Sequence, residues 1–300
     1  MRHRYVFSLL GMVLLLLAVG SSRAQEGWVS LVPGLEYRVV AWELPETGFG
    51  ADLQVLRADP EVVRLKVLDA RDFGGARLTV REFANRTGAL AVINGGYFDT
   101  AERPVGLVMR EGEVTSGLRR RDWGVFLIED VRARIVHTRR YRRRKTITQA
   151  LQAGPPLVVR GRETTLKQTF TRRSAVGIDR AGRILLVLAM TTGPEATMTL
   201  AEFGAILRMP EAEGGLGCLD ALALDGGGSS QLLVNAGGAS FFEVSGEWPV
   251  VTAIGVFYPA AVMPPVEEAP TIEQLPTGPG PSAPSIPPRR KRPSIFRPWE

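Results

Sequence analysis

Short runs of alternating apolar and polar residues recur along the first part of the chain. Leu35–Val39, Leu53–Val55 and Val63–Val67 each place an apolar side chain at every second position. A period of two collects the apolar side chains on one face, which is typical of strands with one buried face. Further short apolar runs extend the series to Trp123–Ile128, Ile184–Leu188, Leu219–Leu224, Gln231–Val234 and Ala253–Phe257. The pattern predicts a domain built mostly of sheet.

Helical periodicity is confined to two segments. Thr199 and Glu202 form a capping-box sequence, in which each side chain satisfies the backbone amide of the other residue. The apolar residues after it recur at helical spacing, and Pro210 follows their end. Leu78–Thr87 predicts a second helix. Few helices among many strands indicate an α+β fold, with a mixed β-sheet core and a few packed helices in a single large domain.

The two ends of the chain differ from this body. Residues 1–24 have a basic start, an apolar run and small residues before Ala24, which predicts a signal peptide and export to the periplasm, the medium or the cell surface. The alternative is an uncleaved membrane anchor, for which an apolar run of about 14 residues is short. Eleven of the 21 prolines fall in the last 40 residues. We therefore expect a disordered Pro/Arg-rich tail over 261–300 and the folded domain over 25–260.

The charge of +6 comes mostly from the ends. Without the three arginines of the signal and the charges after residue 262, the body has 29 basic and 27 acidic residues. A nearly neutral body argues against nucleic-acid binding. Two arginine runs remain, at residues 119–121 and 139–145. They form solvated loops or, alternatively, hold an anionic envelope polymer.

Scarce histidine and cysteine exclude several site types. The body contains one histidine, His137, so a histidine-rich zinc site is excluded. A Ser-His-Asp triad with Ser229 as nucleophile would have to use His137, which has no nucleophile motif nearby, and is therefore disfavoured. Cys218 is the single cysteine, so no disulfide forms within the chain, and we expect a buried thiol. Carboxylates must then carry any proton transfer.

Two apolar runs end in a carboxylate or amide followed by glycines. One is Leu222–Ser230, which ends L-D-G-G-G-S-S, and the other is Ala91–Asp99, which ends N-G-G-Y-F-D. Consecutive glycines beside a buried run are expected where the backbone takes a positive φ or approaches a ligand closely. Two such strand ends converging on one cleft would form a site.

These motifs, with the intervening segments Gln152–Val158 and Arg173–Asp179, resemble the phosphodiester glycosidase family in content and order over roughly residues 53–258. The resemblance implies an enzyme that hydrolyses the glycosidic bond of a sugar-1-phosphodiester. Glycoside hydrolysis commonly uses two carboxyls, and the best placed are Asp225 and Asp99. Asp179, shortly before Ala181-Gly182, is expected to be a turn residue.

A phosphodiester substrate further requires groups that meet its negative charge. Arg173 offers a planar fork for phosphate oxygens, and the amides of Gly226, Gly227 and Gly228 are candidates for an anion-binding nest. The remaining predicted substrate-binding residues are Asn94, Gly95, Gly96, Ser229 and Ser230, with Tyr97 or Phe98 as a wall for a sugar ring.

Two other functions remain open at this point. One is a divalent-metal phosphodiesterase, with Asp225, Asp99 and Asn94 as oxygen ligands of a calcium or magnesium ion. The other is a polysaccharide- or wall-binding module without turnover. The glycosidase hypothesis itself needs no metal or other cofactor.

Overall fold

The computed structural model describes residues 27–43, 50–166, 169–191, 198–236 and 239–259. These residues form eighteen β-strands, two α-helices and four short 3-10 turns. The strands make three sheets, and neighbouring strands within each sheet are antiparallel. The fold is therefore richer in sheet than the expected α+β class, and antiparallel sheets replace the expected mixed sheet.

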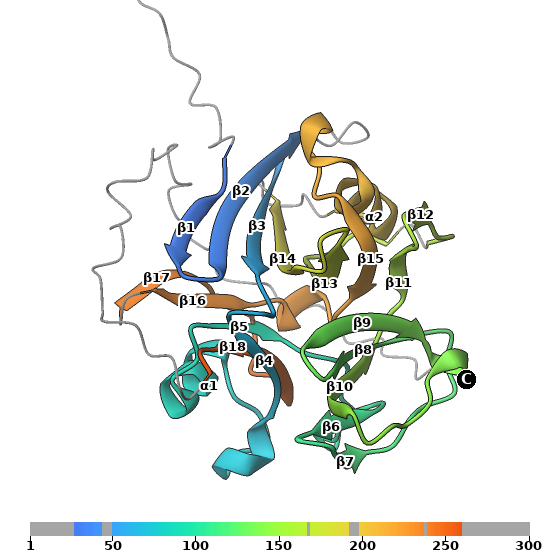
Figure 1. Cartoon of the computed structure of the whole chain (residues 1–300). Helices are drawn as coiled ribbons and strands as arrows, with labels where there is room; N and C mark the ends of the chain where they lie inside the picture. Colours follow the sequence, from blue (N-terminus) through green and yellow to red (C-terminus); the bar gives the residue numbers. More distant parts are fainter. Residues whose placement is uncertain (1–26, 44–49, 167–168, 192–197, 237–238, 260–300) are drawn as a thin grey trace, which may run out of the picture.

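The largest sheet has eight strands and lies across the top of Figure 1. In spatial order its strands are β1 Val29–Val32, β2 Leu35–Glu43, β3 Gly50–Ala58, β14 Ile184–Thr191, β13 Arg173–Asp179, β15 Cys218–Ala223, β11 Pro156–Val159 and β12 Arg162–Glu163. Strand β13 is buried along its whole length because both faces of the sheet are covered.

Two five-stranded sheets lie below it. One has the order β17 Ala239–Val244, β16 Leu232–Ala236, β5 Ala91–Asn94, β18 Thr252–Phe257 and β4 Arg64–Asp69. The other has the order β7 Glu113–Ser116, β6 Val108–Arg110, β10 Ile147–Ala153, β8 Gly124–Glu129 and β9 Arg132–His137.

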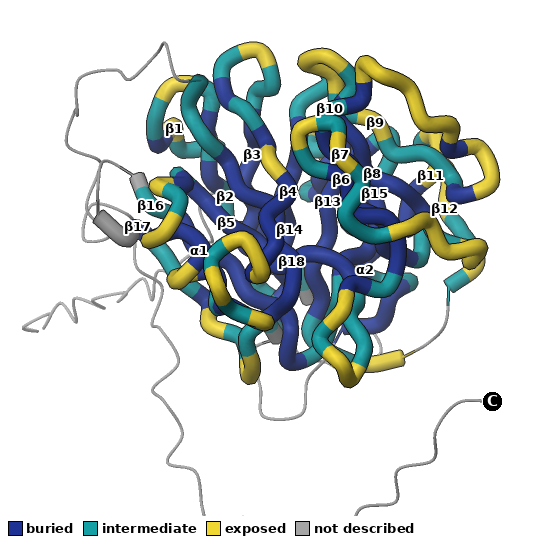
Figure 2. The backbone as a smooth tube through the Cα atoms, turned by 90° about the horizontal axis from the view of Figure 1, so that it is seen from below, coloured by how far each residue is buried: buried dark blue, intermediate teal, exposed yellow. Residues whose placement is uncertain are grey.

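The three sheets share one hydrophobic core. Its buried side chains come from every sheet, for example Leu56 and Leu222 from the first, Ile93 and Ile254 from the second, and Phe126 from the third. Figure 2 shows the central strands buried and most of the exposed residues in the connecting loops. A core shared in this way makes the described residues one cooperative unit.

Both predicted helices are confirmed, together with the cap expected at Thr199. Helix α1, Val80–Thr87, is capped by Thr79 and packs Phe83 against the sheet of β5 and β18. Helix α2, Leu200–Arg208, is capped by Thr199 and packs Phe203 on the outer face of the large sheet. Both have the reciprocal capping box, because the pattern needs only residues three apart in the chain.

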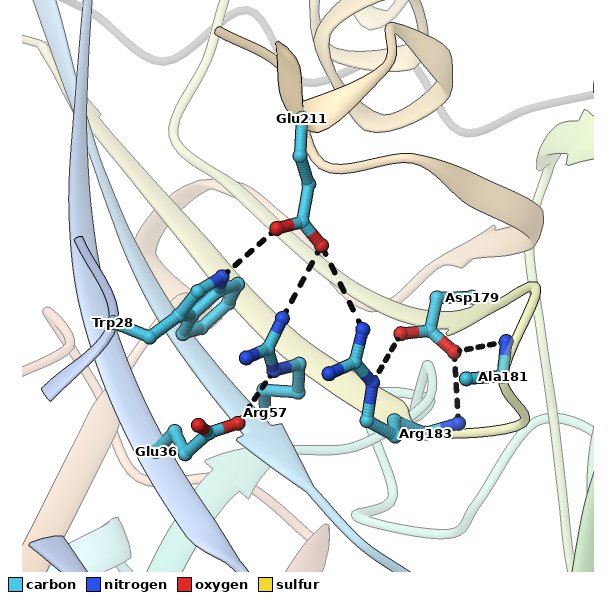
Figure 3. Close-up of polar contacts among 7 residues, drawn as sticks. All are labelled: Trp28, Glu36, Arg57, Asp179, Ala181, Arg183 and Glu211. Carbon is cyan, nitrogen blue, oxygen red and sulfur yellow. Dashed lines mark hydrogen bonds and ion pairs between the residues drawn. The ribbon is translucent and has the colours of Figure 1, made fainter. Parts of the chain in front are cut away.

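A cluster of charged residues links the segments at one end of the large sheet (Figure 3). The Arg57 guanidinium lies over the Trp28 ring at 3.8 Å and pairs with Glu36 at 2.6 Å and Glu211 at 3.2 Å. Nearby, Asp179 accepts hydrogen bonds from two amides of the β13–β14 turn, which confirms it as a turn residue. The cluster lies at the opposite end of β13 from Arg173, about 20 Å away along the strand.

Two of the sequence predictions concern residues outside the described part of the chain, namely the signal peptide at 1–24 and the tail at 261–300. In the described part, neither helix has the length and apolarity that crossing a bilayer requires. Cys218 is buried, as expected, and burial raises the pKa of its thiol.

Candidate functional site

The two glycine-rich strand ends converge where two sheets meet. After β15 the Leu224 N–H donates to the Ser174 carbonyl at 2.9 Å, which keeps the chain against β13. The next amide, that of Asp225, donates to the Gly95 carbonyl just beyond β5 at 3.0 Å. Asp225 therefore lies at the junction of the eight-stranded sheet with the sheet of β5.

Asn94 fastens this junction. Its side chain is fully buried, its Nδ2 donates to the Asp225 carbonyl at 2.7 Å, and its Oδ1 accepts from the Gln231 amide at 3.2 Å. Both ends of the amide are thus bound within the protein. Asn94 therefore orients the backbone that carries Asp225, and its contact with a substrate stays a prediction.

The carboxyl of Asp225 is held in an environment that opposes its charge. Burial raises the pKa of this carboxyl from 3.8 to about 6, although hydrogen bonds from the Ser229 hydroxyl and the Gly226 amide act in the opposite direction. Desolvation outweighs the two donors because both supply only partial charge. The result is a carboxylate that is mostly ionised at pH 7 and more basic than an ordinary aspartate.

Arg173 brings a cation to the same place from the start of β13. Its guanidinium is 7% exposed, and Nε and Nη2 donate to the carbonyls of Met198 and Thr169. The remaining nitrogen, Nη1, lies 3.9 Å from the point that a Cβ on Gly226 would occupy. Burial lowers the pKa of Arg173 to about 10, so it stays charged at neutral pH. Carbonyls rather than a buried aspartate hold this arginine, and among the described residues its positive charge has no ion pair.

Tyr97 links these two groups to the rest of the site. The pKa of its phenol is raised to about 12, first by burial and then by the charge of Asp225, while the charge of Arg173 lowers it. The hydroxyl donates to the Gly154 carbonyl, and the ring contacts the Trp123 ring with 4.9 Å between centroids. Asp225, Arg173 and Tyr97 therefore share one electrostatic environment, with an aromatic pair beside it.

The glycines after Asp225 do not form the expected free nest of amides. The Gly226 amide is directed at the Asp225 carboxylate, and the Gly227 amide donates to the Arg172 carbonyl at 2.9 Å. Gly227 has a φ of +62°, and a Cβ on Gly228 would lie 2.5 Å from the Trp248 ring. Two of the three amides of the predicted nest are thus engaged within the protein, and the glycines serve turn geometry and close packing.

Ser229 and Ser230 have different surroundings. The Ser229 hydroxyl accepts from Trp248 Nε1 at 3.1 Å and donates to Asp225, so it orients the carboxylate. Ser230 is fully buried, and its Oγ has no hydrogen-bond partner among the described residues; the same holds for Oγ of Ser174.

The glycines after Asn94 are places of close backbone approach. A Cβ on Gly95 would lie 2.7 Å from the Thr252 carbonyl oxygen, and one on Gly96 would lie 2.7 Å from that of Gln152. Both glycines are buried, so their role is to let strands meet.

Asp99 lies in the turn that follows this strand end. One carboxylate oxygen accepts from the amides of Ala101 and Arg103, each at 3.0 Å, and the other pairs with the Arg103 guanidinium at 2.8 Å. The Arg103 amide is the main cause of the lowered pKa of Asp99. Both oxygens are thus engaged within the turn, and a catalytic role for Asp99 stays a prediction.

The proposed metal ligands do not form a donor set. The Oδ1 of Asn94 is taken by the Gln231 amide, and both oxygens of Asp99 are taken by its turn. Within the described residues there is also no group of three His, Cys, Asp or Glu side chains placed to hold an ion.

Two hollows lie away from this site, along β4. One, of about 660 Å³, is lined by residues that include Lys66 and Phe257, and the other, of about 270 Å³, by residues that include Arg64 and Gln149. Neither is lined by Asp225, Arg173 or Tyr97. We therefore identify the site by its charges and pKa shifts, which mark catalytic groups more directly than volume does.

Trp123, Trp248 and Gln152 complete the site, and the sequence-based reasoning did not assign them a role. Gln152 is 1% exposed, and its side chain donates to and accepts from the backbone of Arg119. One signal was present in the sequence, since Gln152 is a lone amide within the apolar run Ala150–Ala153. A buried amide usually fastens a neighbouring loop. Nothing in the sequence around the two tryptophans indicated that they would border a site.

Comparison with known proteins identifies the family. A family model for phosphodiester glycosidases matches residues 87–257. No curated protein matches the sequence. Among solved structures, the catalytic domain of zebrafish N-acetylglucosamine-1-phosphodiester alpha-N-acetylglucosaminidase, auto-inhibited by its pro-peptide, is similar with a TM-score of 0.60 at 18% identity, over 77% of this chain and 86% of that one.

Two bacterial structures share the fold at a similar level. A hypothetical protein from Synechocystis has a TM-score of 0.54 at 18% identity, over 77% of this chain and 63% of its own length. A protein of Burkholderia pseudomallei has a TM-score of 0.54 at 16% identity, over 70% of this chain and 75% of its own. These likenesses show the fold, whereas the family model spans more than half of the sequence and includes every segment of the site described above. The chain belongs to the phosphodiester glycosidase family.

Proposed function

We propose that this protein is an exported glycoside hydrolase that cleaves the bond between the anomeric carbon of a sugar and the phosphate of a sugar-1-phosphodiester derived from a glycan or the cell envelope. The observation that carries the proposal is that a buried basic carboxylate, Asp225, and a buried cation, Arg173, both act on the Tyr97 phenol and so share one environment. Membership of the family supports a glycosidase-type activity.

Asp225 is the group that we expect to act at the anomeric carbon. A carboxyl with a pKa of about 6 is ionised at neutral pH and accepts a proton more readily than an aspartate at 3.8. It can therefore deprotonate the attacking water or, as a nucleophile, form a glycosyl-enzyme that water then hydrolyses. In both routes the oxygen of water becomes bonded to the sugar, and the electron pair of the broken bond leaves with the phosphate.

Arg173 meets the charge of the leaving group. As the bond to the anomeric carbon breaks, the phosphate gains negative charge, and a phosphomonoester has its second pKa near 6. Such a leaving group needs a cation more than it needs a proton. The carbonyls of Met198 and Thr169 accept from Nε and Nη2 of Arg173, so Nη1 is the donor that remains for the phosphate. Because the guanidinium is buried, its attraction to the phosphate is stronger than it would be in water.

The test is to follow the oxygen of water. Purified protein is incubated with a short sugar-1-phosphodiester in ¹⁸O-water, with and without a chelator, and Asp225→Asn serves as the control for background hydrolysis. We expect the label on the released sugar and an unlabelled phosphomonoester, with no effect of the chelator. Label in the phosphomonoester, with activity lost on chelation, would show attack on phosphorus by a metal phosphodiesterase and refute the proposal. Binding of the glycan without turnover would refute it as well.

A further inference from the structure

Both arginine runs of the sequence form exposed loops. Residues 119–121 and 139–145 contain nine basic side chains. Arg144 pairs with Glu129 at 3.1 Å. The other eight have no ion pair with any described residue, and they are Arg119, Arg120, Arg121, Arg139, Arg140, Arg142, Arg143 and Lys145. Two acidic residues close by are already engaged, because Asp122 pairs with His137 and Glu129 pairs with Arg134 and Arg144.

One buried side chain holds the two loops together. Oε1 of Gln152 accepts from the Arg119 amide at 2.9 Å, while its Nε2 donates to the Arg119 carbonyl at 2.8 Å and to the Thr138 hydroxyl at 3.0 Å. Thr138 directly precedes the second loop. The first loop and the start of the second therefore lie side by side, and the second loop continues from there toward Glu129, with which Arg144 pairs. We call these two loops together the basic rim.

The basic rim borders the candidate site. Trp123, two residues after the first loop, has its ring against Tyr97, and its carbonyl accepts from both the amide and the hydroxyl of Thr138 at 2.9 Å. Tyr97 is the residue whose pKa responds to the charges of both Asp225 and Arg173. A ligand held by the loops would thus extend directly from the reacting bond.

We propose that the basic rim binds the substrate beyond its reacting unit, and that this substrate is a polymer of sugar or polyol units joined by repeated phosphodiesters. The inference rests on the proposed function and specifies its substrate. One phosphodiester needs only the cation supplied by Arg173, whereas eight unpaired cations match a chain of anions. Guanidinium groups suit phosphate in particular, since their planar fork meets two oxygens at once.

Single-stranded nucleic acid also carries repeated phosphodiesters, but its recognition combines cations with exposed aromatic rings on which the bases stack. The two loops contain a single aromatic residue, Tyr141, and it is 8% exposed. Trp123 is half-buried and its ring lies on Tyr97. A surface of cations without stacking platforms favours a flexible polyol or sugar phosphate.

Binding to a synthetic poly(glycerol phosphate) of about ten units tests this inference, because a chain of phosphodiesters without bases isolates the contact with phosphate. The loop variants are R119Q/R120Q/R121Q and R139Q/R140Q/R142Q. The matched control is R160Q/R162Q/R180Q, which removes three exposed arginines near the β11–β12 turn, at the end of β11 away from Asp225. Circular dichroism and thermal melting verify that each variant is folded.

We expect each loop variant to bind the polymer about tenfold more weakly, with the slope of log affinity against log salt reduced by roughly 2, as three lost phosphate contacts predict. The control should match the wild type. Unchanged affinity in the loop variants, an equal loss in the control, or equally tight binding of polyglutamate or single-stranded DNA of the same charge would overturn the inference.

The same proteins separate the inference from the proposed function. If the wild type cleaves a short sugar-1-phosphodiester and the loop variants bind the polymer as the wild type does, the inference falls and the proposed function stands. Loop-dependent binding of the polymer by a wild type that cleaves no sugar-1-phosphodiester would refute the proposed function and leave the binding surface in place.

Discussion

Replacing Asp225 by asparagine should remove activity and at the same time stabilise the folded protein at neutral pH. The carboxyl has its pKa raised from 3.8 to about 6 by burial. Each pKa unit corresponds to about 1.4 kcal/mol, so the ionised carboxylate costs the fold up to about 3 kcal/mol. Asparagine has nearly the same shape and still accepts from Gly226, but loses the stronger bonds that a charged acceptor makes. We therefore expect a net gain of about 1–2 kcal/mol.

The gain should depend on pH in a defined direction. Because the pKa of Asp225 is higher in the folded than in the unfolded protein, the folded form retains this proton between pH 4 and 6 while the unfolded form releases it. The free energy of unfolding of the wild type therefore falls, through this group, as the pH rises across that window. Asparagine does not titrate. The difference in unfolding free energy between variant and wild type should therefore rise by up to about 3 kcal/mol from about pH 4 to about pH 7, and reach its full value there.

Urea unfolding and thermal melting at several pH values measure this difference, with turnover measured on the same preparations. For a domain of this size, the expected gain raises Tm by about 3–6 °C at pH 7.5. Turnover should fall by a factor of about 10² to 10⁴. The matched control is Asp179→Asn, which removes an ion pair of 2.6 Å with Arg183 at the other end of β13 and should lower stability at pH 7.5.

Two results would refute the reasoning. A variant that is less stable than the wild type at pH 7.5, or whose gain is the same at pH 4 and pH 7.5, would show that burial does not raise the pKa of Asp225. A folded Asp225→Asn protein with full turnover would return the L-D-G-G-G-S-S segment to a purely structural turn.

Three further predictions address the other polar groups. Arg173→Ala should lower kcat/KM about a hundredfold for a sugar phosphodiester but much less for an uncharged aryl glycoside, and Arg173→Lys should restore only part of the loss; equal losses on both substrates would exclude a contact with phosphate. If Asp99 is a second catalytic carboxylate, Asp99→Asn should lower turnover about a hundredfold at unchanged Tm. If turnover is instead kept, and the variant is less stable than the wild type at pH 7 but equally stable at pH 3, Asp99 acts only in the turn with Arg103. Thr199→Ala should destabilise the protein by about 1 kcal/mol in urea unfolding, because it removes the reciprocal cap with Glu202, and an unchanged midpoint would contradict that cap.

Local sequence determined the elements of this protein well. Both helices begin at a threonine whose partner lies three residues further on, and the alternation in Val63–Val67 marks a strand, because these signals involve neighbours in the chain. The carboxylate at the end of an apolar run could likewise be singled out, since a polar residue and glycines there follow directly from composition. The four ordered motifs further indicated the family, which the family model confirms.

Tertiary structure alone decided how those pieces meet. The bond from Asn94 to the Asp225 carbonyl spans 131 positions in the chain, and the packing of Gly95 against Thr252 spans even more. No local pattern shows which backbone amides are already hydrogen-bonded within the protein. The sequence alone therefore predicts an anion-binding nest at the glycines after Asp225. The raised pKa of Asp225 has the same origin, because desolvation is the sum of distant segments folding over one carboxyl. Sequence periodicity specifies which side chains turn inward, whereas the charge state of a buried group depends on everything that surrounds it.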